Sequence, residues 1–372
     1  MDVFKFTGPA NGPMQGGQLV LPSDSVTWVE RYAEAGEVKI VAPIGSGLRE
    51  QLPVGTFVSH TETREVVKIE DHDIADSGGD EDPTLTITGR SMEAPALENR
   101  AAGSNRTFPT AAETLEYKLA ASSTQYQALE LVTHHIEEAY LVDDRDAIPY
   151  FGAVTTVGGT LTVEERTIKP GGVYARLQEI LAVDKLGVKI ERPATGMTDT
   201  RLVIHKGMDR SNQVVMSVDK GDVVNAAYLE SDRKVKNCAL LIGKFVQHRL
   251  VLNPLLTGYD RRWMTVDCSD IDEGQETIPT GDARGIILYL MEVRGREALA
   301  KQKRVELTKA EASHDTISAV YRRDYNVGDI VMVTGGYGAA TKMRVTEYVE
   351  IQDETGFTGY PTLETLEEED TP

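Results

Sequence analysis

The sequence predicts a β-rich α+β fold in which two small antiparallel β-barrel domains are separated by a mixed α/β insertion. Three observations lead to this prediction: runs of alternating apolar residues near both ends, helical periodicity in the middle, and a β-unit that occurs twice. A chain of 372 residues suits two or three domains and can bury a substantial core.

The repeated β-unit consists of a Val-Gly turn, a further strand and a Pro-Thr-Leu strand start. Gly55 precedes Pro83 by 28 positions in the first copy, and Gly328 precedes Pro361 by 33 in the second. The longer copy has an additional Gly-rich turn at 335–338, which has room for the extra residues. Coincidence is the alternative interpretation, because Val-Gly-x-x-Val is common in β-proteins.

Composition shifts place the domain boundaries. The N-terminal segment is rich in Gly and Pro, and the C-terminal segment is rich in Glu. Both compositions are typical of segments without a packed core. The predicted parts are a flexible N-terminal arm (1–18), a first β-barrel (19–104), the α/β insertion (105–199), a second β-barrel with a helical excursion (200–363) and an acidic, disordered tail (364–372).

The strands of the first barrel follow one another as an antiparallel meander. Alternating faces predict strands at 25–32 and 37–42 with a turn at Ala35-Gly36, then strands at 54–58, 66–70 and 84–89. Hairpins of this length can close into a small barrel.

Helical signals begin after this meander. Thr110 and Glu113 have the spacing of a capping box. Between 126 and 140, apolar residues recur at three- and four-residue steps, and a further helix with apolar Leu177 and Ile180 follows Pro170. Strand signals return from about residue 200, so the helices belong to an insertion.

Net charge and cysteine content exclude several classes of protein. A formal charge of −20 argues against a general nucleic-acid binder and against adhesion to an anionic membrane. Cys238 and Cys268 lack zinc-site spacing and are interpreted as reduced, structural thiols. Neither a signal peptide nor a transmembrane run is recognisable, so no membrane insertion by this chain is expected.

No residue pattern indicates catalysis, a metal site or a cofactor. His134 and His135 are adjacent, so on a helix they point about 100° apart and cannot share a ligand face with Glu137 and Glu138. The acidic loops 143–146 and 270–274 have oxygens that suit calcium, but the second lacks the distal Glu of an EF-hand, and both are interpreted as solvated loops. Phosphate-binding loops and nucleophile elbows are absent from the sequence as well. We therefore predict that the protein is not an enzyme.

Aromatic residues gather in both β-rich ends. They pack a barrel core or a subunit interface in one interpretation, and bind carbohydrate from an exposed face in another. These aromatic residues are Trp28, Tyr32, Tyr321, Tyr325, Tyr337, Tyr348 and Tyr360.

Three segments resemble a known family. They are the hairpin at 28–32 and 37–40, the transition Gly89-Arg90-Ser91 with Leu97 and Arg100, and the closing run at 321–331 with 344–347. Together they resemble the tail-tip proteins of long-tailed bacteriophages (siphophages), a family similar to the tail-hub proteins at the centre of phage baseplates. Residues 105–280 carry no such resemblance.

The resemblance implies a structural virion protein. In that family a trimeric ring adapts the six-fold tail to the tip and surrounds or closes the DNA exit channel. The implied partners are two further copies of the chain, the distal tail protein ring, the tape-measure protein and tail fibre or tip proteins, without stable nucleic-acid binding. The alternatives are a host-surface carbohydrate-binding module of a phage tail and a cell-wall-degrading tail enzyme.

The two Val-Gly turns are the predicted subunit interface. We expect Gly328→Trp to impair ring assembly without unfolding the monomer. The competing interpretation is that Gly55 and Gly328 only permit a tight turn with positive φ. The predicted interface residues are Val54, Gly55, Val58, Val327, Gly328, Asp329 and Val331.

Overall fold

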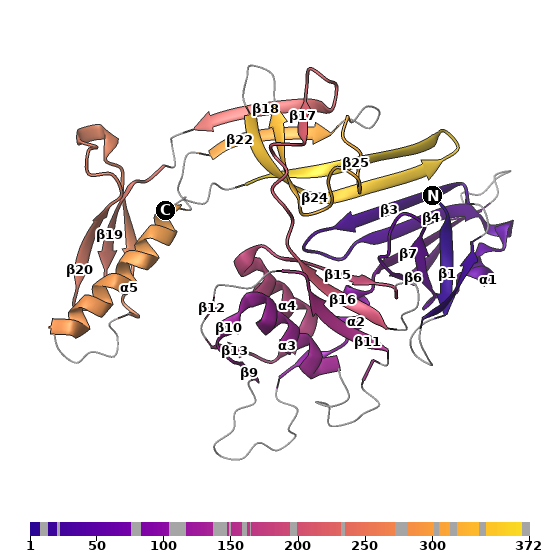
Figure 1. Ribbon diagram of the computed structural model, residues 1–372, viewed down its shortest axis with the longest axis horizontal. Coiled ribbons are helices and arrows are strands. Elements are labelled where there is room, and N and C mark those ends of the chain that lie inside the picture. The colour runs from indigo at the N-terminus through magenta and orange to yellow at the C-terminus, as the bar shows by residue number, and fades with distance from the viewer. Residues whose placement is uncertain are drawn as a thin grey trace, which may run out of the picture. The chain divides into compact units, whose positions relative to one another are not determined.

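The computed structural model describes residues 1–7, 14–20, 23–75, 83–103, 117–136, 147–148, 150–157, 162–163, 165–193, 199–231, 235–271, 281–300, 305–312, 318–334 and 340–366. The chain divides into two compact units (Figure 1). The first contains Met1–Val224 and Glu311–Glu364, and the second contains Asn225–Ala310 and Thr365–Pro372.

A sheet of eleven strands dominates the first unit. Its strands are β1 (Val3–Thr7), β2 (Gln15–Leu19), β3 (Ser25–Arg31), β4 (Glu37–Pro43), β5 (Phe57–His60), β6 (Val67–Ala75), β7 (Thr84–Ser91), β17 (Val215–Ser217), β23 (Ile330–Thr334), β24 (Ala340–Asp353) and β25 (Gly356–Thr365). Their order is β17-β23-β24-β3-β4-β7-β6-β5-β1-β2, with β25 paired to β24. Strand β17 pairs parallel with β23.

Alternation along the strands builds one core on this sheet. Every second residue of β7 is buried, as expected for a strand with one face turned inward. Trp28, Ile40, Ile69 and Ile87 are fully or almost fully buried there. Two short turns complete the meander, η2 (Ile44–Ser46) and α1 (Leu48–Gln51).

The two predicted β-units belong to one sheet. No closed barrel is found among the described strands, in contrast to the two barrels that the sequence predicts. The reason is the length of β24, whose 14 residues pair with β23 near one end and with β3 near the other. Figure 1 shows β24 running beside β3, so segments about 320 positions apart share main-chain hydrogen bonds.

The N-terminal arm is a correction to the sequence prediction. Residues 1–18 include β1 and most of β2, and β1 pairs with β5 from Val3↔His60 to Phe6↔Phe57. Val3 is buried in the same core, so a few apolar residues hold a Gly- and Pro-rich segment in the sheet. Glu364, placed in the acidic tail, lies in β25.

The α/β part of the first unit has a three-stranded sheet covered by helices. Its main elements are α2 (Glu93–Leu97), α3 (Thr124–Ile136), β11 (Phe151–Thr155), α4 (Val173–Leu181), η5 (Ala182–Asp184), β15 (Gly187–Glu191) and β16 (Thr200–His205). Short pairs are formed by β8 (Ala101–Ala102), β9 (Tyr117–Leu119), β10 (Ser122–Ser123), β12 (Thr162–Val163), β13 (Arg166–Ile168) and β14 (Gly171–Gly172). Figure 1 shows α3 and α4 beside the sheet β11-β16-β15.

Helical periodicity predicts α3 and α4 correctly. Val132 and Ile136 are buried on α3, and Leu177 and Ile180 are buried on α4. They form one core with Leu202 of β16. The predicted capping box at Thr110 lies outside the described residues, as do Tyr337 and the Gly-rich turn at 335–338.

The second unit contains a sheet and a long helix with their own core. It includes most of β18 (Val223–Ser231) and β22 (Val305–Ala312), together with β19 (Cys238–Ile242), β20 (Gln247–Val251), η6 (Gly258–Asp260), β21 (Trp263–Asp267) and α5 (Gly281–Ala300). Met291 of α5 packs with Leu241 and Leu250 in this core. Residues 200–363 therefore do not form one domain, because 225–310 have a separate core.

Both cysteines are buried and free, as the sequence predicts. Across the described part of the chain, no helix has both the length and the apolar composition needed to cross a bilayer.

Candidate functional site

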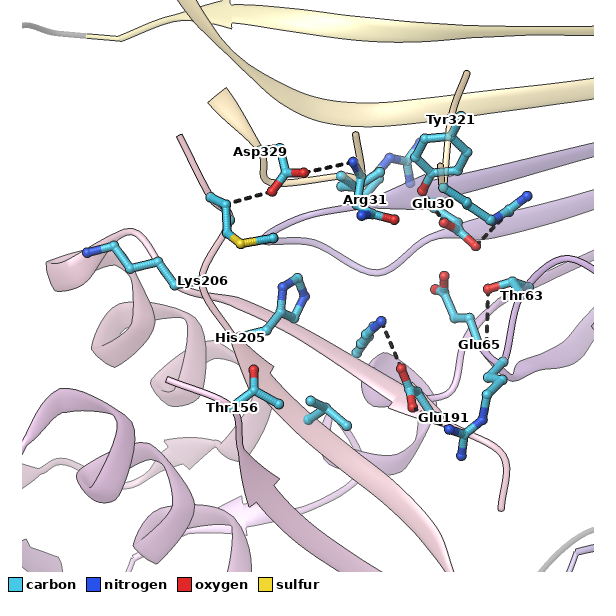
Figure 2. A pocket seen from close by; sticks show the side chains of 18 of the residues that line it. Glu30, Arg31, Thr63, Glu65, Thr156, Glu191, His205, Lys206, Tyr321 and Asp329 are labelled. Atoms are coloured by element: carbon cyan, nitrogen blue, oxygen red, sulfur yellow. Dashed lines mark hydrogen bonds and ion pairs between the residues drawn. The ribbon is translucent and has the colours of Figure 1, made fainter. Parts of the chain in front are cut away.

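The opening and closing segments of the first unit meet beside the α/β part. We call this region the joint, and its central residues are Glu30, Tyr32, Tyr321, Arg322, Gly328 and Asp329. A polar cavity of about 680 Å³ lies there. Figure 2 shows Glu30, Tyr321 and Asp329 on the side of the large sheet and His205 and Glu191 on the side of the α/β part.

Tyr32 connects three segments of the chain. Its hydroxyl donates a hydrogen bond to the Lys185 carbonyl (2.9 Å) and accepts one from the Gly207 amide (3.1 Å). A Cβ at Gly187 or Gly328 would lie 2.4 or 2.2 Å from an atom of the Tyr32 ring. Real Cβ atoms do not approach so closely, so the ring requires glycine at both positions.

Gly328 has a second constraint besides this ring. Its φ is +96°, a conformation that side chains with a Cβ rarely adopt. A Cβ at Gly207 would also lie 1.8 Å from the Gly328 carbonyl oxygen. The close packing of Tyr32, Gly207 and Gly328 therefore fixes the backbone before β23, and the expected Gly328→Trp variant would disturb the monomer itself.

Arg322 is the centre of a partly buried ion cluster. Its guanidinium donates two hydrogen bonds to Glu350 (2.8 and 2.9 Å) and one to Glu30 (3.0 Å). His60 Nε2 lies 3.2 Å from Glu350 Oε2, the oxygen that also accepts from Arg322 Nη2, and the Tyr321 hydroxyl donates to Glu30. Arg322 adopts a left-handed φ of +64°, which these contacts hold in place.

The cluster changes the protonation of its members. Burial alone would raise the pKa of Glu350, but hydrogen bonds from His60 and Arg322 outweigh burial and lower it to about 2. Burial and the neighbouring Glu30 carboxylate raise the pKa of Tyr321, so its hydroxyl stays a donor. The charged groups of the cluster, Arg322, Glu30 and Glu350, therefore pair with one another.

Asp329 holds the turn that begins β23. Its carboxylate is almost fully buried and accepts hydrogen bonds from the amides of Met208 (2.7 Å) and Asn326 (3.0 Å) and from Arg210 Nε (2.9 Å). This interaction ties the closing turn to the segment after β16. Asp329 is one of the predicted interface residues, and its role in an interface stays a prediction.

The first Val-Gly turn is open where the second is packed. Gly55 has a φ of +90°, and a Cβ there would meet nothing within 4 Å. Val54 is 58% exposed beside it, whereas Val58 and Val331 are fully buried in the sheet. Val327 is half-buried. Both glycines thus have the positive φ that the turn interpretation requires, and the interface role remains a prediction.

Two carboxyl groups are buried next to the cavity. The Ser91 hydroxyl donates to Glu65, while one oxygen of Glu93 has no partner among the described residues. Burial raises the pKa of Glu93 to about 8, and burial with the nearby Glu30 and Glu93 raises that of Glu65. Ser91 belongs to the Gly89-Arg90-Ser91 transition noted in the sequence. In the structure this motif supplies a hydrogen bond to the buried Glu65 carboxyl group.

Three further charged groups of the cavity form internal pairs. Glu191 pairs with Lys189 (2.8 Å) and with Arg64 (3.5 Å). Burial and the Lys189 charge lower the pKa of His205 to about 4, so its imidazole is neutral at pH 7. These pairs stabilise the joint.

The histidine pair predicted to be a helix face without a metal lies on α3. His135 lies against the Leu131 carbonyl (2.7 Å) and accepts from the Gly103 amide, and His134 stacks on Tyr117. Glu137 and Glu138 lie outside the described residues. In the described ranges, no group of three His, Cys, Asp or Glu residues is arranged to hold a metal ion.

Sequence reasoning missed Glu350, His60, Gly187 and Gly207. Each acts through a partner more than 120 positions away, and no local pattern marks such pairs. A weak signal exists for the glycines, since Gly187 opens a strand and Gly207 follows one, where a close approach of another backbone often requires glycine.

The architecture is that of phage tail proteins. The chain superimposes on a 43 kDa tail protein of prophage MuSo2 from Shewanella oneidensis with a TM-score of 0.59 and 11% identity, covering 100% of both chains. A tail protein from Neisseria meningitidis MC58 matches with a TM-score of 0.53 and 15% identity over 94% of each chain. At identities this low, the superpositions establish a shared fold and nothing more.

Family membership follows from the sequence. The model of the family described as Siphovirus ReqiPepy6 Gp37-like protein matches residues 17–363, which include the joint and both β-units. The chain belongs to this siphovirus family. No curated protein matches it by sequence.

Proposed function

We propose that the chain is a structural protein of the siphophage tail tip, a baseplate hub without catalytic activity. The observation that carries this proposal is the tail-protein fold over the full length of a chain from a siphovirus family. The joint supports it physically, because several charged groups of its cavity are paired, Arg322 with Glu30 and Glu350 among them, and these pairs hold distant segments of the fold together.

The proposed assembly is a ring of three copies. Each copy contributes two related β-units, so three copies offer six similar faces to a six-fold tail, which closed symmetry permits. We propose that each β-unit presents a barrel-like face in that ring. The ring would contact the distal tail protein, the tape-measure protein and fibre or tip proteins, and surround the DNA exit channel.

The copy number in the virion tests the hub directly. A reconstruction of the tail tip of virions that carry this chain should show three copies around the tail axis. Six copies would instead indicate a tail-tube or ring protein, and a single copy would contradict the hub.

Val54 tests the proposed interface. It is 58% exposed on the open turn, so Val54→Arg should leave thermal unfolding unchanged while reducing incorporation into tails. Val183→Arg is the matched control, because Val183 is 52% exposed on η5 of the α/β part. Normal tails with Val54→Arg would remove this turn from the interface.

A further inference from the structure

Helix α5 of the second unit presents apolar residues on two opposite faces. On one face, Ile287 and Met291 pack into the core of the unit, and Figure 1 shows α5 beside β19 and β20. The residues of the other face are between 38% and 67% exposed, and we call them the outer stripe: Ile286, Tyr289, Leu290 and Val293. Their spacing of three, four and seven positions places them on one side of a helix with 3.6 residues per turn.

Helix α4 shows how the same chain builds a helix that packs on one side only. Its inner face includes the buried Leu177, whereas Glu179 is exposed and pairs with Arg176. In α5, by contrast, Glu292 is the one charged residue between 286 and 293. A helix with apolar residues on all sides is characteristically covered on all sides, so the outer stripe calls for a second surface to pack against.

We propose that the outer stripe packs against the outer stripe of a second copy of this chain. Helices pack on one another through apolar residues at these spacings, and a helix of a second copy presents the same spacing. The charges beside the stripe and the net charge of the second unit both favour a second copy as the partner.

The charged residues that flank the outer stripe already have partners within the copy. Glu292 lies on one side of the stripe, 2.9 Å from His248 Nε2, and Arg294 lies on the other side and donates to Asp270 (2.8 Å). A partner therefore needs no charged group to match them. The surface that fits is an equally apolar one, which a second outer stripe provides.

Net charge favours a contact between copies through the second unit. Copies of a chain with a charge of −20 repel one another. Residues 225–310, which make up most of the second unit, contain 14 Lys and Arg residues and 12 Asp and Glu residues, so this segment is close to neutral. The acidic excess lies in the rest of the chain, so repulsion between copies is weakest where two second units meet.

The size of the outer stripe sets the strength of the contact. Its four side chains expose on the order of 400 Å², so two stripes bury on the order of 800 Å² in total. Stable interfaces bury roughly 1,200 Å² or more, so the contact is reversible in solution. In the proposed ring, on which this last step rests, neighbouring copies have an effective concentration of about 1 mM, which favours the contact.

Sedimentation velocity of the full chain over about 10 to 500 µM tests the contact. The sedimentation coefficient should rise with concentration, and Leu290→Glu or Ile286→Glu should weaken self-association by at least about 10-fold, because each buries a carboxylate in the contact. Leu255→Glu is the matched control, since Leu255 is 87% exposed in the same unit and lies outside α5. It should self-associate like the wild type.

Self-association that is absent from the wild type, or weakened equally by Leu255→Glu, would overturn the proposal. Circular dichroism verifies that the variants are folded, as expected for changes at exposed positions. The variant Val54→Arg separates this contact from the proposed ring interface, because it should keep full self-association in solution while it reduces incorporation into tails.

Disulfide cross-linking tests whether α5 meets α5. Leu290 lies near the middle of the outer stripe, so Leu290→Cys should give a cross-linked dimer under mild oxidation, whereas Leu255→Cys should give far less. Both native cysteines, Cys238 and Cys268, are buried, so the wild type should remain uncross-linked. A Leu290→Cys chain that stays monomeric at concentrations where the wild type associates would show that another surface makes the contact, which overturns the proposal.

Discussion

The two Val-Gly turns have the same backbone conformation and opposite surroundings. Gly55 and Gly328 have φ values of +90° and +96°. The space beside Gly55 is empty, whereas the Tyr32 ring occupies the space beside Gly328. One local motif therefore serves as a surface turn in the opening copy and as a packed contact in the closing copy.

The largest effect is expected from Gly328→Ala. A methyl group there meets the Tyr32 ring and also requires an unfavourable φ, so the free energy of unfolding should fall by about 3 kcal/mol. Chemical denaturation measures this loss. Gly55→Ala, which has only the φ cost, should lose about 1 kcal/mol.

Equal losses at Gly328 and Gly55 would remove the distinction between the two turns. A double-mutant cycle with Tyr32→Ala sharpens it, because the truncated side chain makes room for the methyl group. The cost of Gly328→Ala should then approach that of Gly55→Ala.

A smaller loss, about 2 kcal/mol, is expected for Arg322→Met. The change leaves the carboxylates of Glu30 and Glu350, whose side chains are 12% and 5% exposed, without their guanidinium. Urea denaturation of the variant provides the measurement.

Arg90→Met is the counterpart in the opening copy. Arg90 pairs with Glu70 and Glu98, but its side chain is 42% exposed, so water replaces the lost pairs and less than about 1 kcal/mol is expected. If both arginine variants lose the same stability, the closing copy is not held more tightly than the opening one.

The last expected effect depends on pH. The folded-state pKa of Glu93 is raised to about 8, so its stabilising contribution is complete below the unfolded value and is lost as pH rises towards 8. Glu350, with a lowered pKa, loses its contribution only as pH falls towards 2. Between pH 4.5 and about 8, stability should therefore decrease by at most about 1.4 kcal/mol per pH unit for one proton.

Glu93→Gln isolates this contribution, because the amide remains neutral at every pH. Thermal denaturation of the variant should show a flatter pH dependence than the wild type over the same window. Glu98→Gln, an exposed change on the same segment, should retain the wild-type slope. A slope unaffected by Glu93→Gln would show that the buried acid of the opening copy is not protonated in the folded state.

The elements that could be predicted are those specified by neighbouring residues. Alternation predicts β3, β4 and β7, and helical spacing predicts α3 and α4, because both depend on which side of a local segment is apolar. The resemblance at residues 28–32 and 321–331 led to the correct family. The same two segments supply the joint.

The pairing of distant elements could not be predicted from local patterns. In the sequence, β24 is a strand of the closing β-unit alone. In the structure its C-terminal half pairs with β3, which joins the two expected barrels into one sheet. Glu30 and Arg322 are each unremarkable polar residues in the sequence and form an ion pair across 292 positions.

The strands β3, β4 and β7, the helices α3 and α4, the buried thiols and the siphovirus family follow from the sequence alone, since periodicity, residue size and motif order are local properties. Only the tertiary structure decided which glycine faces solvent and which faces Tyr32. It also decided which carboxylates become ions and which remain protonated, because desolvation and partner distance exist only once remote segments pack together.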